Sequence, residues 1–172
     1  DWTKLQSRTP LAHACRAAAY REGGFHRDEL REIDLWRKKD PSNIAVDAWR
    51  SIAQAKLGRY HTAAADGTAL LARATEEKRP AWSRLALDLR ASALFQGKEY
   101  QDCLKDLNQR ISSDPSNARA YYWRSRAHEE LGNIRDSEAD VNRWLAREAY
   151  DFKVSVLQIM GRDREAVKTA KE

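Results

Sequence analysis

The sequence has 172 residues, of which 42% are hydrophobic and 33% charged, and its 31 Lys and Arg against 26 Asp and Glu give a net charge of +5. It has no run of 18 apolar residues, which excludes a membrane protein, and six Trp, six Tyr and three Phe with nearly balanced charge disfavour intrinsic disorder. Only seven Gly and four Pro are present, whereas an all-β protein needs many turns. The composition therefore indicates a helical protein.

The predicted elements lie between these few Gly and Pro residues. The intervening stretches are rich in Ala, Leu, Arg, Glu and Gln, with apolar residues three or four positions apart, as is typical of helices. In chain order we predict helices over residues 11–22, 27–39, 44–57, 60–78, 81–96, 100–113, 118–131, 135–147, 149–159 and 163–171. Gly suits the left-handed residue that ends a helix, and Pro suits the first turn of the next helix.

The breaks between helices recur at a regular interval. The tetrapeptide Asp-Pro-Ser-Asn occurs at positions 40–43 and again at 114–117, and Pro80 lies near the midpoint between the two copies. The glycines at positions 24, 58, 97, 132 and 161 follow one another at spacings of roughly 30–40 residues, within the range of helical repeats. This regularity predicts a repeat of helix pairs.

The residue pattern within each period resembles the tetratricopeptide repeat (TPR) family. The clearest copy is the segment 118–133, and the segments that begin with Gly97-Lys98-Glu99-Tyr100 and Gly58-Arg59-Tyr60 follow the same pattern. One departure is Arg124-Ser125, which stands where the family has Leu-Gly. The resemblance covers nearly the whole chain.

This resemblance implies an all-α fold, a right-handed superhelical α-solenoid of antiparallel helix pairs. We expect a single TPR-like domain over residues 1–172, with units at about 10–41, 44–80, 81–115 and 118–148 and a partial unit at 149–172. Because one helix pair cannot cover its own apolar face, stacked pairs build the core. The large residues that we expect between the helices are Tyr60, Tyr100, Trp144 and Leu145.

In TPR proteins the first helices line a concave face that usually holds an extended peptide or a partner's helix. Transfer of the family's groove positions gives Ala45, Ala48, Trp49, Ile52 and Ala55 in the second unit, Arg84, Leu87, Asp88, Ala91 and Leu94 in the third, and Arg119, Tyr122, Trp123, Arg126 and Glu129 in the fourth. Among these we predict apolar anchors at Trp49, Tyr122 and Trp123, and residues that bind acidic groups at Arg84, Arg119 and Arg126. A solvent-exposed helix surface that binds no ligand, on which Arg stacks on the indole, explains the cluster around Trp123 equally well.

Some co-chaperone TPR domains bind a C-terminal carboxylate through Lys, Asn and Arg side chains at such positions. Here Ala48 and Ile52 replace the first pair of these residues, and Asp88 replaces the middle Asn. The sequence therefore does not predict this ligand.

The sequence lacks the residue groupings that catalysis or metal binding requires. His13 and Cys15, two residues apart on a helix, point about 200° apart, and His26 and Glu29 share a face but have no third ligand nearby. Neither a phosphate-binding Gly-rich loop nor a nucleophile elbow is present. We therefore predict no enzymatic activity, no cofactor and no metal site.

Taken together, these features indicate a non-catalytic scaffold that binds another protein with apolar and acidic groups. Self-assembly is one alternative, because the last unit stops within its second helix and leaves the C-terminal end of the solenoid exposed. Nucleic-acid binding is another, since the pI is about 9.3, but charges of mixed sign along the helices argue against it. The chain begins with Asp1 rather than Met, as expected of a fragment or a processed protein, and we expect it in the cytoplasm.

Overall fold

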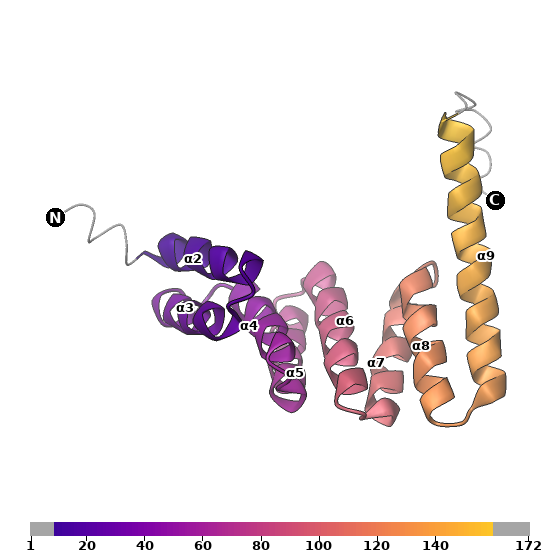
Figure 1. Cartoon of the computed structure of the whole chain (residues 1–172), viewed down its shortest axis with the longest axis horizontal. Coiled ribbons are helices and arrows are strands. Elements are labelled where there is room, and N and C mark those ends of the chain that lie inside the picture. Colours follow the sequence, from indigo (N-terminus) through magenta and orange to yellow (C-terminus); the bar gives the residue numbers. More distant parts are fainter. Residues whose placement is uncertain (1–8, 160–172) are drawn as a thin grey trace. The chain divides into compact units, whose positions relative to one another are not determined.

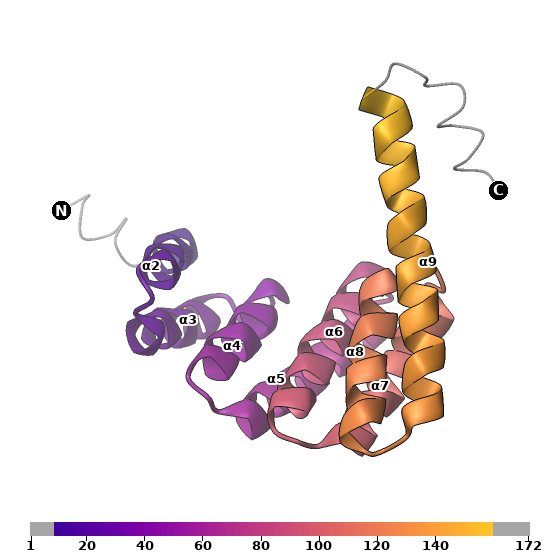
Figure 2. The ribbon, with the colours of Figure 1, turned by 45° about the vertical axis from the view of Figure 1, so that its right-hand side comes forward.

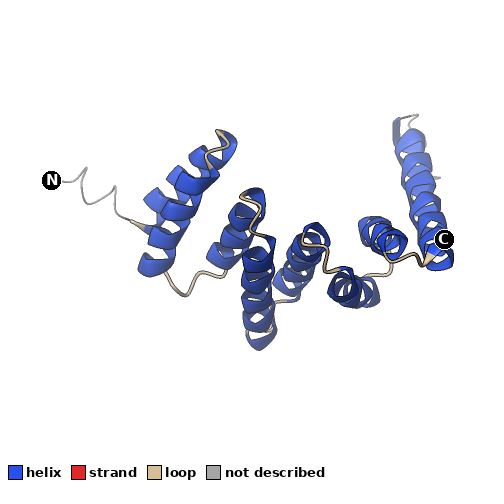
Figure 3. Cartoon of the chain, turned by 60° about the horizontal axis from the view of Figure 1, so that its bottom comes forward, coloured by secondary structure: helices blue, strands red, loops and turns tan. Residues whose placement is uncertain are grey.

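The computed structural model of the chain describes residues 9–159, and Figure 1 shows how its helices follow one another. The helices are α2 (Pro10–Glu22), α3 (His26–Lys39), α4 (Ala45–Lys56), α5 (Tyr60–Glu76), α6 (Pro80–Gln96), α7 (Tyr100–Ser113), α8 (Ala118–Glu130) and α9 (Ile134–Ile159). Figure 3 shows that the regular structure of this range is entirely helical. None of the described helices is both long and apolar enough to cross a membrane.

The chain divides into two compact units, residues 1–109 and 110–172, and the division falls inside α7. In the first unit α2 packs against α3 and α4 against α5, while α6 is joined by side-chain hydrogen bonds to the part of α7 that belongs to this unit. In the second unit α8 packs against α9 (Figures 1 and 2). The predicted antiparallel helix pairs are thus confirmed, and the single domain over residues 1–172 stays a prediction.

Two of the turns between helix pairs are built by the repeated Asp-Pro-Ser-Asn sequence. The carboxylate of Asp40 accepts hydrogen bonds from Ser42 Oγ at 2.9 Å and Asn43 Nδ2 at 3.1 Å, and Asn43 Oδ1 accepts one from the Ala45 amide. In the second copy Asn117 Oδ1 accepts from the Ala120 amide at 3.0 Å and caps α8. The predicted helix stop and restart is confirmed, because the two Asn side chains accept hydrogen bonds from amides that a helix N-terminus leaves free.

The prediction of two helices over 135–147 and 149–159 is wrong, because α9 runs through both without a break. No Gly or Pro lies between Ile134 and Ile159, and the sequence at the expected break, Ala146-Arg147-Glu148-Ala149, consists of strong helix formers. Figure 2 shows α9 extending well past the end of α8. The helix predicted over 163–171, and with it most of the partial fifth unit, lies outside the described residues.

The turns inside the helix pairs share one left-handed residue. It is Gly24, Gly58 and Gly132 in three pairs, with φ between 72° and 75°, but in the third pair it is Lys98, with φ 63°. Gly97, whose place in the sequence predicted this role, has φ −76° instead. The period from Gly58 to Lys98 is therefore longer than the periods before and after it, and the additional residues lengthen α5 and α6 at the ends where they meet.

Replacement of Lys98 by Gly is expected to raise the free energy of unfolding by about 0.5–1 kcal/mol, because a side chain with a Cβ is strained at this positive φ. The matched variant Gly58→Ala should lower it by about 1 kcal/mol, since open space surrounds Gly58 and only the backbone opposes a Cβ. Urea unfolding of both variants measures the two effects. Equal stability of Lys98→Gly and the parent chain would contradict the assignment of strain to this turn.

The core consists of clusters that join consecutive helix pairs of the first unit. One cluster comprises Ala17, Ile33, Trp36, Val46 and Ala53, and the next comprises Ile44, Ala48, Leu70, Ala74 and Ala86. Small residues on the first helices thus pack against large residues on the preceding second helix. Of the large residues expected between helices, Tyr60, Tyr100 and Trp144 are half-buried, but Leu145 is 50% exposed, so its predicted burial is wrong.

Candidate functional site

An arginine of the first helix binds an acid of the second helix in every described helix pair. The acid always lies 16 residues after the arginine, and the donor-to-acceptor distances are 3.0 Å for Arg16–Glu32, 3.0 Å for Arg50–Asp66, 2.7 Å for Arg90–Asp106 and 2.7 Å for Arg124–Asp140. Each arginine also lies eight residues before the left-handed residue of its turn. The buried small residue that follows each arginine is Ala17, Ser51, Ala91 or Ser125. This repeated ion pair fixes the register of the two helices within each pair.

The ion pair between Arg50 and Asp66 differs from the other three ion pairs. Asp66 is 8% exposed, and its Oδ2 has no hydrogen-bond partner among the described residues. Burial raises the pKa of Asp66, and the nearby Arg50 guanidinium opposes this rise. Arg50 is shared, because its Nε also lies 3.3 Å from Asp34 on α3.

The register given by the arginines corrects the groove positions transferred to α6. Because Arg50 corresponds to Arg90, the position equivalent to Ala45 is Leu85, one residue after Arg84. Leu87, Ala91 and Leu94, which were also predicted to line the groove, are 2%, 4% and 7% exposed and belong to the core. The shift arose because Gly97 was taken as the counterpart of Gly58, whereas the structure gives that place to Lys98. The positions transferred to α8 need no such shift.

A cleft of about 410 Å³ lies between the first helices α4 and α6, which contact each other within the first unit. It is lined by Ser51, Ile52, Ala55, Lys56, Tyr60, Leu89, Ser92 and Gln96. Ile52 and Ala55 from α4 and Leu89 from α6 provide an apolar surface. Two of these residues, Ile52 and Ala55, were predicted to line the groove, whereas Leu89 and Ser92 were missed through the one-residue shift. Lys56 and its equivalent Gln96 do not correspond to any of the transferred groove positions.

The polar side chains of this cleft are available to a ligand. Lys56 and Ser92 are exposed, and neither makes a hydrogen bond or ion pair with another described residue. The one hydroxyl already in use belongs to Ser51, whose Oγ donates to the Ala63 carbonyl at 2.9 Å. The cleft therefore combines an apolar surface with an unpaired cation and a free hydroxyl.

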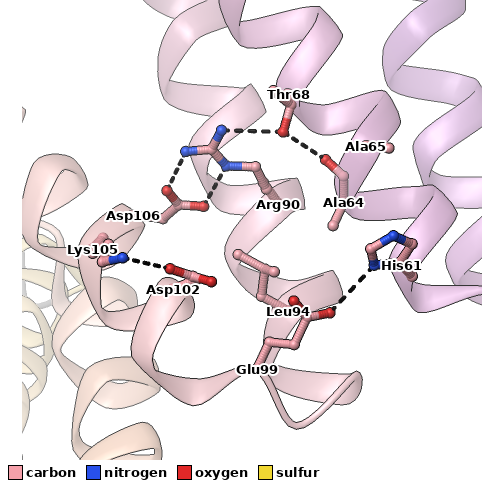
Figure 4. Close-up of a pocket in the computed structure, with 10 residues that line it drawn as sticks. All are labelled: His61, Ala64, Ala65, Thr68, Arg90, Leu94, Glu99, Asp102, Lys105 and Asp106. Atoms are coloured by element: carbon pink, nitrogen blue, oxygen red, sulfur yellow. Dashed lines mark hydrogen bonds and ion pairs between the residues drawn. The ribbon is translucent and has the colours of Figure 1, made fainter.

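A second cleft, of about 340 Å³, lies against the second helices of the same unit and is shown in Figure 4. Its charged side chains are paired with one another: Arg90 with Asp106, Lys105 with Asp102 at 2.7 Å, and His61 with Glu99 at 3.7 Å. The Lys105 ammonium lowers the pKa of Asp102. Because its charges are already paired, this cleft is the weaker candidate for binding a charged ligand.

Trp49, the apolar anchor predicted on α4, is half-buried at the edge of the core rather than free in a groove. Its ring meets Trp36 edge-on, with the ring centroids 5.8 Å apart, and the Arg21 guanidinium lies 3.9 Å from its centroid. These contacts join α2, α3 and α4. Arg84 is exposed on α6 and makes no ion pair with another described residue.

The remaining predicted site residues gather on α8 in the second unit. Tyr122 is half-buried between Trp123, with centroids 5.4 Å apart, and Trp144 of α9, with centroids 5.0 Å apart. Arg126 pairs with Glu129 at 3.2 Å, whereas Arg119 is exposed and makes no ion pair within the described residues. The structure thus brings an aromatic cluster and two exposed guanidinium groups onto one short helix.

The two histidines singled out in the sequence have acidic partners in the structure, and the buried cysteine is unreactive. His13 is buried and its Nδ1 lies 2.7 Å from Glu32, and His26 Nδ1 lies 2.8 Å from the buried Glu29, as their spacing predicted. Cys103 is fully buried, and burial raises its pKa to about 12, which makes the thiol unreactive. Residues 9–159 hold no group of three or more side chains placed to bind a metal ion.

Several solved structures share this fold. The structure of MamA from Desulfovibrio magneticus RS-1 matches with a TM-score of 0.72 at 17% identity, over 94% of this chain and 91% of that chain. The chain has the fold of MamA. A MamA RS-1 double mutant gives 0.72 at 17% identity over 94% of this chain and 90% of that one, and another MamA crystal structure gives 0.71 at 19% over 96% and 90%.

The likeness to MamA confirms the predicted TPR-like all-α solenoid fold. At identities of 17–19% it establishes the fold alone. No protein-family model matches the chain, and no curated protein matches it.

Proposed function

We propose that this chain is a non-catalytic TPR scaffold that binds a segment of another protein in the cleft between α4 and α6. The observation that carries the proposal is the composition of that cleft of about 410 Å³, in which Ile52 and Ala55 of α4 and Leu89 of α6 lie beside polar side chains. Ligand clefts commonly combine apolar walls with a few polar groups that fix orientation. The helices that form the walls are held by core packing, which lowers the ordering cost of binding.

The chemistry of the cleft favours a segment that carries an apolar side chain next to an acidic one. Ile52 and Leu89 offer an apolar surface, and the unpaired Lys56 lies at the same cleft. On α8 of the second unit, the exposed Arg119 and Arg126 beside Tyr122 and Trp123 form a separate candidate surface of the same character. A net charge of +5 agrees with an acidic partner.

Selection from a random peptide library displayed on phage tests this proposal and requires no identified partner. The expected result is a set of peptides with a shared apolar and acidic motif, whose binding Ser92→Arg weakens at least tenfold, because the new side chain fills the cleft, an effect of roughly 1.4 kcal/mol or more. Ala69→Arg, which adds the same charge on the exposed side of α5, should leave binding unchanged. The proposal is wrong if both variants bind the selected peptides as tightly as the parent chain.

A further double variant tests the contribution of α8, and binding of random RNA tests the nucleic-acid alternative. The double variant Arg119→Glu and Arg126→Glu should weaken acidic peptides without changing helicity, since both side chains are exposed. Random RNA should bind weakly, with an affinity that falls steeply with salt, because such binding depends on phosphate neutralisation. Tight RNA binding that Ser92→Arg leaves intact would favour the nucleic-acid alternative instead.

A further inference from the structure

The interface between consecutive helix pairs occurs twice inside the first unit and has the same parts each time. Its first half is a second helix: α3 offers Ile33 and Trp36, and α5 offers Leu70 and Ala74. Its other half is a first helix whose small residues lie against these side chains. These small residues are Val46 and Ala53 on α4 and Ala86 on α6, all at most 1% exposed. Ala93, the residue of α6 equivalent to Ala53, is 1% exposed as well.

A polar contact crosses each of these two interfaces at the same place. Arg50 Nε of α4 lies 3.3 Å from Asp34 Oδ1 of α3, and Arg90 Nη1 of α6 donates to Thr68 Oγ1 of α5 at 3.2 Å. Asp34 and Thr68 occupy equivalent positions in consecutive helix pairs. The arginine of each first helix therefore binds its own acid on one side and a polar residue of the preceding pair on the other.

Helix α2 carries the residues that a first helix contributes to this interface. Among the described residues, no preceding second helix packs against them. One period before Ala45, Val46, Trp49 and Ala53, the chain has Leu11, Ala12, Cys15 and Ala19. Leu11 is 72% exposed, and Cys15 and Ala19 are exposed as well, although the residues equivalent to Ala19 on α4 and α6 are fully buried.

Arg16, the arginine of this series on α2, likewise lacks the contact with a preceding helix pair that Arg50 and Arg90 make. Arg16 binds Glu32 and His13, but its Nη1 has no partner within residues 9–159. Its side chain is 37% exposed, compared with 26% for Arg50 and 21% for Arg90, whose interfaces are complete.

Helix α9 presents the opposite half. The residues equivalent to Gly67, Thr68, Leu70 and Leu71 of α5 are Val141, Asn142, Trp144 and Leu145. Leu145 is 50% exposed, and the exposed Asn142 makes no hydrogen bond with another described residue. This helix thus offers an apolar surface and a polar side chain at the positions that α3 and α5 use inside the chain.

We propose that the α9 surface of one copy of this chain docks on the α2 surface of a second copy, head to tail, and repeats the interface between internal helix pairs. Asn142 of one copy then takes the place of Asp34 or Thr68 and binds Arg16 of the next copy, while Trp144 and Leu145 cover Ala12, Cys15 and Ala19. Because the two surfaces differ, the contact is heterologous and each added copy leaves a free surface at both ends. The assembly therefore grows beyond a dimer, either into an open chain of copies or until the copies close into a ring.

Sedimentation velocity over a concentration series tests this interface with two variants that block one surface each. Ala19→Arg places a long side chain where the internal counterparts are fully buried, and Leu145→Arg places the same charge on the opposite surface. The parent chain should increase in mass with concentration beyond a dimer. Each variant alone should stay monomeric, with its affinity for itself reduced at least tenfold, and an equimolar mixture should form a dimer of twice the monomer mass, because one functional surface of each kind remains.

Several outcomes would overturn the proposal. A parent chain that is monomeric at every concentration shows that neither surface receives a second copy, whether or not another segment covers it. Self-association of either variant alone indicates a contact between identical surfaces. A mixture that fails to associate, when both variants keep the helical circular dichroism of the parent, excludes the pairing of α2 with α9.

Thiol alkylation gives a readout that needs no variant. Cys15 lies on the docking surface and is exposed, whereas Cys103 is fully buried and unreactive, so the native chain reports Cys15 alone. Its alkylation should slow several-fold as the concentration rises into the range of assembly. An unchanged rate in assembled material contradicts the docking surface.

The variant Ser92→Arg distinguishes failure of the peptide site from failure of the docking surface. It blocks the cleft between α4 and α6 and should leave both the assembly and the protection of Cys15 unchanged.

Discussion

Replacement of Asp140 by Ala is expected to lower the free energy of unfolding by about 3–5 kcal/mol, because it removes the carboxylate that binds a mostly buried guanidinium. Both Nε and Nη2 of Arg124 donate to Asp140 at 2.7 Å, and the side chains are 15% and 3% exposed. A buried cation that loses its counterion keeps the cost of desolvation without the compensating attraction. Urea unfolding followed by circular dichroism measures the loss.

The double variant Arg124→Met and Asp140→Leu distinguishes two contributions to the free energy of unfolding. One is the destabilisation by an unpaired buried charge, and the other is the net contribution of the ion pair itself. Apolar side chains of similar volume avoid the desolvation of both ions, so most of the lost stability should return. Glu138→Ala, which removes one exposed carboxylate from the same helix, should change the unfolding free energy by no more than about 0.5 kcal/mol. A loss of the same size for Asp140→Ala and Glu138→Ala would show that net charge, rather than the buried pair, determines stability.

Replacement of Trp36 by Ala should cost about 3–5 kcal/mol, because it leaves a cavity between three helices that the neighbours fill only partly. Trp36 is 7% exposed and lies in the cluster that joins α2 and α3 to α4, with its ring against the edge of Trp49. Thermal and urea unfolding should both show the loss. The matched control is Leu11→Ala, which truncates a side chain that is 72% exposed and should change stability by at most about 0.5 kcal/mol.

Replacement of Trp49 by Ala distinguishes a structural role of this residue from a role in ligand binding. If Trp49 serves the core, as its packing against Trp36 and Arg21 indicates, Trp49→Ala should lower stability and leave affinity for selected peptides unchanged after correction for the folded fraction. Loss of affinity in a fully folded Trp49→Ala variant would restore the anchor role predicted from the repeat pattern.

The helices could be predicted from sequence with small errors because their ends are marked locally. Asp40 accepts hydrogen bonds from the side chains of Ser42 and Asn43, and Asn43 accepts one from the Ala45 amide of the same turn. The left-handed glycines act through a conformation that other residues rarely adopt. These effects span a few residues and are visible in the sequence itself. The missed continuity of α9 has the same explanation, since the segment 146–149 carries no such mark and consists of helix formers.

The candidate site was harder to predict because it depends on register. A shift of one residue in a helix turns a side chain by about 100°, so taking Gly97 as the end of the turn moved the expected groove on α6 from Leu85, Leu89 and Ser92 to Arg84, Asp88 and Ala91, the last of which belongs to the core. A signal in the sequence could have prevented this error. Aligning each unit on its arginine and on the acid that this arginine binds gives the observed register without reference to glycine, because the spacing between the two is the same in all four pairs.

The sequence by itself determined the fold class, the helix pairs and the period, because capping side chains, glycine turns and apolar spacing act within one or two turns of chain. Only the tertiary structure decided which side chains are buried, which arginines bind which acids and where the cleft lies. Trp49 and Trp123 stand at equivalent positions in the sequence, yet Trp49 packs against Trp36 and Arg21 while Trp123 packs against Tyr122. The reason is that burial and pairing depend on the neighbouring helices, which the local sequence does not specify.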